Sequence, residues 1–328
     1  MAVKREKWQK VLERCSEWAD ALSKPKTIVR NFVNIEKINR ILILLIIVIM
    51  LILGISICGR QSKVNMPIVL LTDYGSEDYR ISELKGIIYT NNPAARVIDA
   101  THCVPVFDIA TGAFILDVSA NEFPEKVVFI AIVAPYTQPP TKYLVLTTNK
   151  NQIFVLPDNG LLTYVVKDMG IKTIYEISNQ ALFDKPMKDL VAERIQGKVG
   201  ALIASGYDPN DVGSPLTSFT TLDVQEAAIV DHKLLGTIVY IDHYGNAVTN
   251  ISERTASEFG VKPGDMIQVK GLGNTIAMKF GTIYSDVPQG EEIIFVSNNL
   301  GTVQLSINLG NFAITYGVKA GAKIEIEK

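Results

Sequence analysis

The sequence is poor in the residues that build metal centres and disulfide frameworks. Its 328 residues include three cysteines and three histidines, at Cys15, Cys58, Cys103, His102, His232 and His243. The cysteines are too far apart to indicate a disulfide framework or a zinc site. Three histidines argue against a multi-histidine metal centre. We therefore expect a chain whose function needs no metal.

Signatures of phosphate binding are also missing. Neither G-x-G-x-x-G nor G-x-x-x-x-G-K-[ST] occurs, so neither a dinucleotide site nor a Walker-type site is predicted. From residue 61 onward the chain carries 21 basic and 29 acidic residues. A net negative charge repels a phosphate backbone. We expect no nucleic-acid partner.

The first 40 residues differ from the rest of the chain. They contain ten basic and five acidic residues, and both tryptophans. Apolar residues recur at three- and four-residue steps over 4–22, which predicts an amphipathic helix. Such a helix suits the lipid headgroup layer, but one packed on the protein's own body or on a sister helix has the same pattern. We interpret 1–40 as a basic amphipathic tail.

A run of 18 residues without a charge follows at 41–58. A bilayer core takes about 20 apolar residues as a helix, so this run predicts a transmembrane helix. About 40 residues precede it and no A-x-A site follows, which argues against a cleaved signal peptide. Basic residues crowd its N-terminal side. The positive-inside rule then predicts a single-pass membrane protein with a cytoplasmic N-terminus, a linker at 59–66 and an extracytoplasmic body.

The segment 67–215 has the pattern of an α/β domain. Predicted strands at 67–72, 96–100, 126–133, 143–147 and 153–156 are combined with a predicted helix at 81–90. This alternation is typical of a βαβ sheet, which binds ligands at the carboxyl ends of its strands. The polar positions that follow such ends are Asp73, Asp99, the loop 134–141, Asp158 and Asn159.

The remaining segment, 216–328, is rich in short strands and predicts a small all-β, barrel-like domain. Near its start, residues 236–250 read GTIVYIDHYGNAVTN. Gly245 permits a positive φ, so the turn brings together Asp242, Tyr244 and Asn246. A carboxylate, a ring and an amide side by side can recognise an ammonium group and an aromatic base. The same residues also suit a plain solvent-facing hairpin, so both interpretations remain open locally.

Five motifs occur in order along residues 67–328, here called the body. They are LLTDYG (70–75), IDATHCVP (98–105), LPDNGLLTYV (156–165), YIDHYGNAVTNI (240–251) and NNLGTVQLSINLGN (298–311). Each motif alone is weak. Together, in this order and spacing, they make the body resemble the S-adenosylmethionine hydroxide adenosyltransferase family, whose relatives include chlorinases and fluorinases that use S-adenosylmethionine.

The resemblance implies an α/β domain followed by a smaller barrel-like domain. It also implies a homotrimer, with the ligand held between one subunit's first domain and its neighbour's second. The ligand would be S-adenosylmethionine or an adenosine compound, without a metal. In the family, water or halide attacks the ribose C5′ and methionine leaves. The protein's task is to hold the ribose, exclude bulk water and aim the nucleophile in line.

The resemblance assigns binding roles residue by residue. Asp73 matches the ribose-binding carboxylate, and Asp242 matches the carboxylate that meets the methionine ammonium. Tyr244 and Asn246 match the groups that hold adenine. Asn299 lies where the family has a residue near the methionine carboxylate. The pair Asp158 and Asn159 matches a motif that shapes the pocket.

The catalytic positions depart from the family. Hydrolytic members carry an Asp-Arg-His set that handles the attacking water, and here the Asp position is Ala134 and the Arg position is Thr141. The stretch that should hold the histidine, 189–194, reads DLVAER. Halogenating relatives also lack the set but place a tyrosine at the first position. Ala134 matches neither pattern, although Tyr136 lies two places on.

We therefore expect a protein that binds an adenosyl ligand with lost or altered catalysis. One alternative is an active hydrolase, making adenosine and methionine from S-adenosylmethionine and water, or a halogenase, in either case using non-standard residues. The other is a structural trimer without a ligand.

Overall fold

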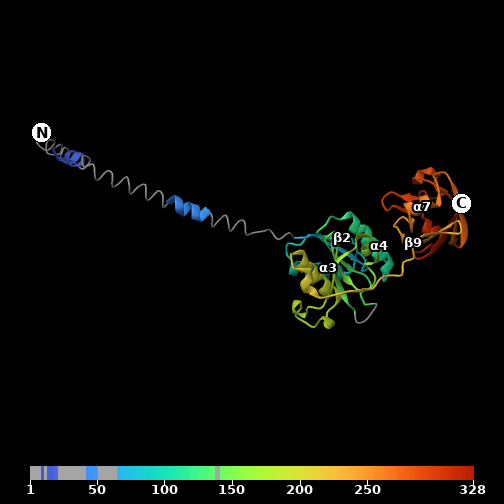
Figure 1. Ribbon diagram of the computed structural model, residues 1–328, viewed down its shortest axis with the longest axis horizontal. Coiled ribbons are helices and arrows are strands. Elements are labelled where there is room, and N and C mark those ends of the chain that lie inside the picture. Colours follow the sequence, from blue (N-terminus) through green and yellow to red (C-terminus); the bar gives the residue numbers. More distant parts are fainter. Residues whose placement is uncertain (1–8, 11–12, 21–41, 51–64, 137–140) are drawn as a thin grey trace. The chain divides into compact units, whose positions relative to one another are not determined.

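A computed structural model describes residues 9–10, 13–20, 42–50, 65–136 and 141–328 (Figure 1). The chain divides into two units, 1–63 and 64–328, which are treated separately below. In the first unit, the described residues are helical. The amphipathic helix predicted over 4–22 is thus described only at 9–10 and 13–20, and whether it contacts lipid or protein stays a prediction.

The predicted transmembrane helix is corrected by the structure. Within the described ranges, no helix is both long and apolar enough to cross a membrane. The prediction at 41–58 is therefore wrong, and so is the single-pass localisation based on it. Residues 41 and 51–58 of that segment lie outside the described residues.

The second unit begins with an α/β domain built on a seven-stranded sheet. Its strands are β1 (Ile68–Thr72), β2 (Val97–Thr101), β3 (Val128–Ile132), β4 (Tyr143–Thr148), β5 (Ile153–Pro157), β6 (Ile171–Ile177) and β7 (Gly213–Pro215). Their order across the sheet is β2-β1-β3-β5-β4-β6-β7. The first four in this order are mutually parallel, and β4, β6 and β7 each pair antiparallel with the strand before them in the order. The carboxyl ends of β1, β3 and β5 therefore meet at one edge.

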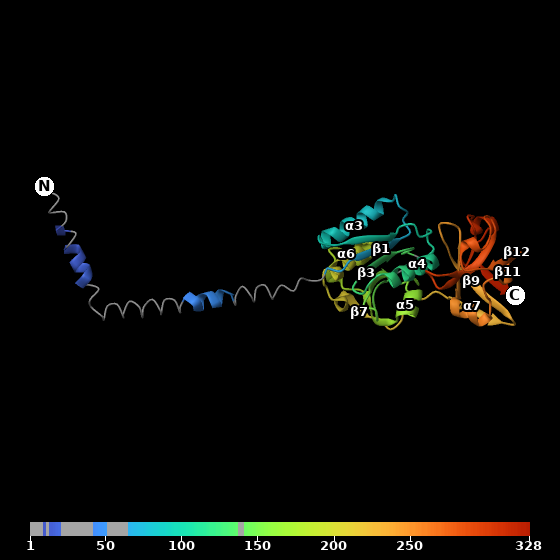
Figure 2. The ribbon, with the colours of Figure 1, turned by 90° about the horizontal axis from the view of Figure 1, so that it is seen from above.

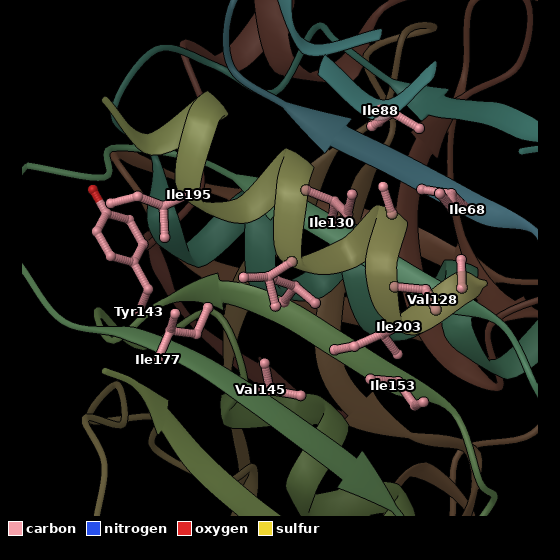
Figure 3. Packing of buried hydrophobic residues seen from close by; sticks show 14 of the residues in the cluster. Ile68, Ile88, Val128, Ile130, Tyr143, Val145, Ile153, Ile177, Ile195 and Ile203 are labelled. Atoms are coloured by element: carbon pink, nitrogen blue, oxygen red, sulfur yellow. The ribbon is translucent and has the colours of Figure 1, made fainter. Parts of the chain in front are cut away.

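Helices cover both faces of this sheet (Figure 2). They are α3 (Tyr79–Asn91), α4 (Ile109–Glu122), α5 (Thr163–Met169) and α6 (Ala192–Ala204), with short 3₁₀ turns η1 (Gln180–Leu182), η2 (Met187–Asp189) and η3 (Pro209–Val212). α3 and α6 pack on the face that carries Ile68 and Ile130, whereas α4 and α5 pack on the face that carries Val69 and Phe129. Figure 3 shows α6 lying over Ile130, with Tyr143 and Ile195 at one end. Burial on both faces explains why β1, β3 and β5 read as continuous apolar runs.

The rest of the second unit is a small β-barrel. Its strands are β8 (Ala228–Val230), β9 (Lys233–Ile241), β10 (Ala247–Ser252), β11 (Met266–Leu272), β12 (Asn274–Phe280), β13 (Glu292–Ser297), β14 (Thr302–Ile307) and β15 (Lys323–Glu327). The order β10-β14-β13-β12-β11-β15-β9 closes into a ring because β9 also pairs with β10, and β8 adds to β9. Helices α7 (Glu253–Phe259) and α8 (Phe312–Tyr316) and the turn η4 (Tyr284–Asp286) lie in the connections. The α/β domain and the barrel expected from the sequence are thus both present.

A pair of carboxyl groups, Asp117 buried and Asp168 exposed, lies where α4 meets α5. Asp117 on α4 is 9% exposed and, with Asp168 on α5, lines a cavity of about 560 Å³. Burial, and then the neighbouring Asp168, raise the pKa of Asp117 to about 7. Asp117 therefore holds a proton in the folded protein over a pH range in which an unfolded chain would release it.

We expect Asp117→Asn to stabilise the protein at pH 8. Because the folded pKa lies above the ordinary value of about 3.9, protonation favours folding below pH 4, and that contribution is lost as the pH rises through 7. The amide cannot ionise, so the variant should gain about 2 kcal/mol over the wild type at pH 8 and little at pH 4. Thermal melting at both pH values measures this. A difference that does not change with pH would contradict the assignment, and Asp184→Asn, at an exposed position, is the control.

Candidate functional site

The first half of the candidate site lies at the carboxyl edge of the α/β sheet. Asp73 directly follows β1 and is buried. Its Oδ2 atom accepts the backbone N–H groups of Phe107 and Ala134, each at 3.1 Å. Both donors have positive φ angles, 65° and 43°, which residues other than glycine rarely adopt. One carboxylate thus holds two strained loops, the first after β2 and the second after β3.

The loop after β5 joins the same half-site. Asn159 is buried, and its Nδ2 atom donates to the carbonyls of Val133 at 2.9 Å and Ala134 at 3.3 Å. Asp158 faces elsewhere, because its Oδ1 atom accepts the N–H of Thr220 at 2.6 Å. The structure therefore brings Asp73, Ala134 and Asn159 together. Asp158 fixes the chain that leads to the barrel.

Two other positions considered from the sequence lie outside this contact network. Asp99 pairs with Lys85 at 2.7 Å and with His102 at 3.3 Å. Thr141 is half-buried just before β4, and the neighbouring Lys142 lies 3.5 Å from Glu176. Lys142 is thus engaged in an ion pair.

The second half of the candidate site is the turn between β9 and β10. The Oδ1 atom of Asp242 accepts the N–H groups of Tyr244 and Asn246, each at 2.9 Å. Its Oδ2 atom accepts the Nδ2–H of Asn246 at 2.7 Å. Tyr244 is 75% exposed, whereas Asn246 is 4% exposed. The turn thus holds a buried amide and, two residues away, an exposed aromatic ring.

Two residues that no sequence pattern singled out orient this amide. Tyr284 accepts from Asn246 Nδ2 at 3.2 Å and from Gln304 Nε2 at 2.8 Å. The Tyr284 ring is itself held edge-on against Phe295, with centroids 5.0 Å apart. Gln304 lies within the last of the five motifs, but no spacing rule links it to residue 246. This network fixes the orientation of the Asn246 side chain before any ligand arrives.

Gly245 is required at the centre of the turn. Its φ is 85°, and a Cβ atom added there would collide with the side chain of Asn311. Its carbonyl accepts the N–H of Ala313 at 2.9 Å. The turn is therefore packed against the start of α8 and is more than a solvent-facing hairpin.

Asn299 is not brought to this turn. β10 pairs with β14 so that Ala247 lies opposite Leu305 and Ser252 lies opposite Thr302. Asn299, in the loop before β14, is therefore near the far end of β10, about 16 Å from the turn at 3.3 Å per residue. It lines the same cavity as Asp117 and Asp168.

A polar cluster, missed from the sequence, lies beside Ala134. The Tyr74 hydroxyl donates to Glu193 Oε1 at 2.8 Å, and Arg80 Nε lies 4.0 Å from that oxygen. Glu193, on α6, is 6% exposed. The Tyr136 hydroxyl accepts the N–H of Ala192 at 3.0 Å. Glu193 falls within the stretch 189–194, where the resemblance implies a histidine, but no local pattern connects it to residue 74.

The electrostatics of this cluster favour protonated phenols. Burial, and then the charge of Glu193, raise the pKa of Tyr74 far above its ordinary value of 10. Burial also raises the pKa of Tyr143, with smaller contributions from Tyr136 and Glu193. Tyr74 therefore stays a hydrogen-bond donor at any physiological pH. In the part of the chain that the structure describes, no group of three or more His, Cys, Asp or Glu side chains is arranged to hold a metal ion.

Two family descriptions match the chain. "SAM hydroxide adenosyltransferase N-terminal domain" matches residues 68–213, and "SAM hydroxide adenosyltransferase C-terminal domain" matches residues 236–325. The matches cover the α/β sheet and most of the barrel, respectively.

Characterised relatives match over nearly their whole length. The (R)-S-adenosyl-L-methionine hydrolase of Methanocaldococcus jannaschii is 29% identical over 270 residues, covering 79% of this chain and 95% of the relative. The fluorinase of an Actinoplanes species is 25% identical over 296 residues, covering 80% of this chain and 98% of the relative. This chain is thus similar both to enzymes that use water and to enzymes that use halide.

Solved structures match the same region. An uncharacterized conserved protein from Thermotoga maritima has a TM-score of 0.75 and 29% identity, covering 80% of this chain and all of that one. A conserved hypothetical protein from Thermus thermophilus has a TM-score of 0.63 and 20% identity, which shows similarity of fold.

Proposed function

Because the chain belongs to the S-adenosylmethionine hydroxide adenosyltransferase family, we propose that it binds S-adenosylmethionine, or another adenosine compound, at a site completed between subunits of a homotrimer. The observation that carries this proposal is the turn at Asp242, Tyr244 and Asn246. Its amide is held in one orientation and its ring is exposed. A fixed amide reads the edge of a purine, and an exposed ring stacks on the purine face.

The two carboxylates suit the rest of the ligand. An ionised carboxylate offers about four lone-pair positions, and internal donors occupy three at Asp242 and two at Asp73. Asp242 thus retains room for one ammonium hydrogen, and Asp73 for the hydroxyl pair of a ribose. Hydrogen bonds to ionised groups are the stronger kind, so both contacts favour this ligand.

The chemical end of the site differs from that of the hydrolytic members. Ala134 supplies a backbone N–H to Asp73 but no side-chain acid or base. We therefore propose that catalysis by the family's usual set is lost. Hydrolysis by other residues is the second candidate function, and the buried carboxylate of Glu193 beside this loop favours it.

Calorimetry on the full chain tests the proposal. S-adenosylmethionine and adenosine are titrated separately, while adenosine, methionine and 5′-chloroadenosine are followed by chromatography in buffer with chloride. Saturable binding of either compound supports the proposal. Failure of both to bind would overturn it in favour of a structural role.

We expect Asn246→Ala to weaken adenosine binding about tenfold. Both Nδ2 hydrogens of Asn246 are donated within the protein, so the amide meets the base through its Oδ1 acceptor, and one lost hydrogen bond is worth about 1.4 kcal/mol. The variant also removes a donor to Asp242 and Tyr284. Titration calorimetry measures the effect, with Asn210→Ala at an exposed site as the matched control. Equal affinity of Asn246→Ala and wild type would exclude this turn as the purine site.

A further inference from the structure

Two loops and the start of α3 contact Glu193 or the residue before it, and the Glu193 carboxylate is buried. Tyr74, from the loop after β1, donates to Glu193 at 2.8 Å. Tyr136, from the loop after β3, accepts the N–H of Ala192, the residue before Glu193. Arg80, at the start of α3, lies within 4.0 Å of the same carboxylate. Glu193 is thus held by the residue that follows Asp73 and, through Ala192, by the loop after β3 that Asp73 also anchors.

Glu193 is also adjacent to the candidate ribose site. Tyr74 follows Asp73 directly in the chain, and the charge of Asp73 contributes to the raised pKa of Tyr74. Ala134, which donates to Asp73, is two residues before Tyr136. A ribose held by Asp73 would therefore place its reacting carbon at the edge of the sheet where Glu193 lies.

A purely structural role accounts poorly for this arrangement. Burying an ionised carboxylate costs several kcal/mol, and well-packed apolar residues of similar volume are often at least as stable. Glu193 is 6% exposed among residues that pack on the apolar core under α6. Burial, and then Glu193, raise the pKa of the neighbouring Tyr74, and groups with perturbed pKa values at the carboxyl edge of a sheet are characteristic of reaction sites.

We propose that Glu193 is the general base of this protein, and that Tyr74 is a positioning residue that orients it. This inference rests on the proposed function, because it needs S-adenosylmethionine at Asp73. Glu193 accepts a proton from water as the water oxygen forms a bond to C5′. The C5′–S bond breaks and its electron pair stays on sulfur. The products are adenosine and methionine, whose sulfur is uncharged. The proton then passes from Glu193 to solvent, which balances the reaction.

The test measures turnover and binding separately on full-length variants. Glu193→Gln should lower kcat for adenosine formation about 100-fold or more, the range for a lost general base, with the Kd for S-adenosylmethionine changed less than about threefold. Glu193→Asp keeps a carboxylate and should recover at least a tenth of the wild-type kcat. Tyr74→Phe should lower kcat about tenfold, again with little change in Kd. Glu83→Gln, on α3 and paired with Arg194 at 3.5 Å, is the matched control.

Each contrary result has a distinct meaning. Wild-type protein that binds S-adenosylmethionine but forms no adenosine overturns the role of Glu193 and leaves the binding function intact. Turnover unchanged in Glu193→Gln overturns it as well. A fall in kcat that Glu193→Asp does not reverse, with a parallel fall in melting temperature, shows a structural role instead. Wild-type protein that does not bind any adenosyl compound overturns both proposals.

Discussion

Replacing Asp73 with asparagine is expected to weaken S-adenosylmethionine binding about 100-fold while leaving the α/β domain folded. The amide oxygen of the new side chain can still accept the N–H groups of Phe107 and Ala134, so both strained loops keep their anchor. The ribose side loses the charge, and the amide nitrogen presents hydrogens where hydroxyl hydrogens would approach. Two charge-assisted hydrogen bonds are worth about 3 kcal/mol together, which is roughly a hundredfold in Kd.

The matched control for this substitution is Asp78→Asn. Asp78 caps α3, where its Oδ1 atom accepts the N–H of Arg80 at 2.8 Å, and asparagine caps helices as well as aspartate does. Calorimetry should therefore show wild-type affinity for the control, with unchanged melting temperatures for both asparagine variants. Asp73→Ala goes further, because it leaves two buried N–H groups unpaired and should cost about 2–4 kcal/mol of unfolding free energy. If Asp73→Asn binds as tightly as the wild type, the ribose is not held at β1.

Much of the α/β sheet could be predicted from the sequence because its central strands are buried on both faces. Such strands read as unbroken apolar runs, and the polar residue that ends each run marks the edge of the sheet. α4 gave no comparable signal. It packs on the sheet and also faces the barrel, where the Phe114 ring stacks on the Tyr240 ring with centroids 5.3 Å apart. Because two sides of the helix are covered, its sequence lacks a clear polar face. The apolar run at 41–58 gave a strong but wrong prediction of a transmembrane helix, since no helix among the described residues is both long and apolar enough to cross a membrane.

The candidate site was predictable only where its contacts are local. Asp242, Tyr244 and Asn246 lie within five residues of one turn. Their proximity could therefore be predicted from the sequence. Glu193 meets Tyr74 across 119 positions, and tertiary packing alone brings the two together. Missing residues at the family's catalytic positions were visible in the sequence. The polar cluster of Tyr74, Arg80, Tyr136 and Glu193 could be identified only from the folded structure.

We expect Phe154→Ala to be the most destabilising of the substitutions considered, at about 3–5 kcal/mol of unfolding free energy. Phe154 on β5 is fully buried and pairs in register with Phe129 on β3. Their rings stack with centroids 4.9 Å apart and planes 7° apart. Alanine leaves a cavity between two central strands, which surrounding side chains fill only in part. Denaturation by urea followed by circular dichroism measures the loss, since both tryptophans lie outside the body, at Trp8 and Trp18.

The same substitution should also weaken ligand binding, although Phe154 lies near the start of β5 and the candidate site lies at its end. β3 ends next to Ala134 and β5 ends next to Asp158 and Asn159, and Asn159 ties these two ends together. Loosening β3 against β5 therefore shifts the loop that donates to Asp73. Phe154→Leu, which keeps most of the apolar volume, should cost about 1.5 kcal/mol or less and preserve affinity. If Phe154→Ala lost stability but bound S-adenosylmethionine as the wild type does, the loops alone would determine the site, independently of the strands beneath them.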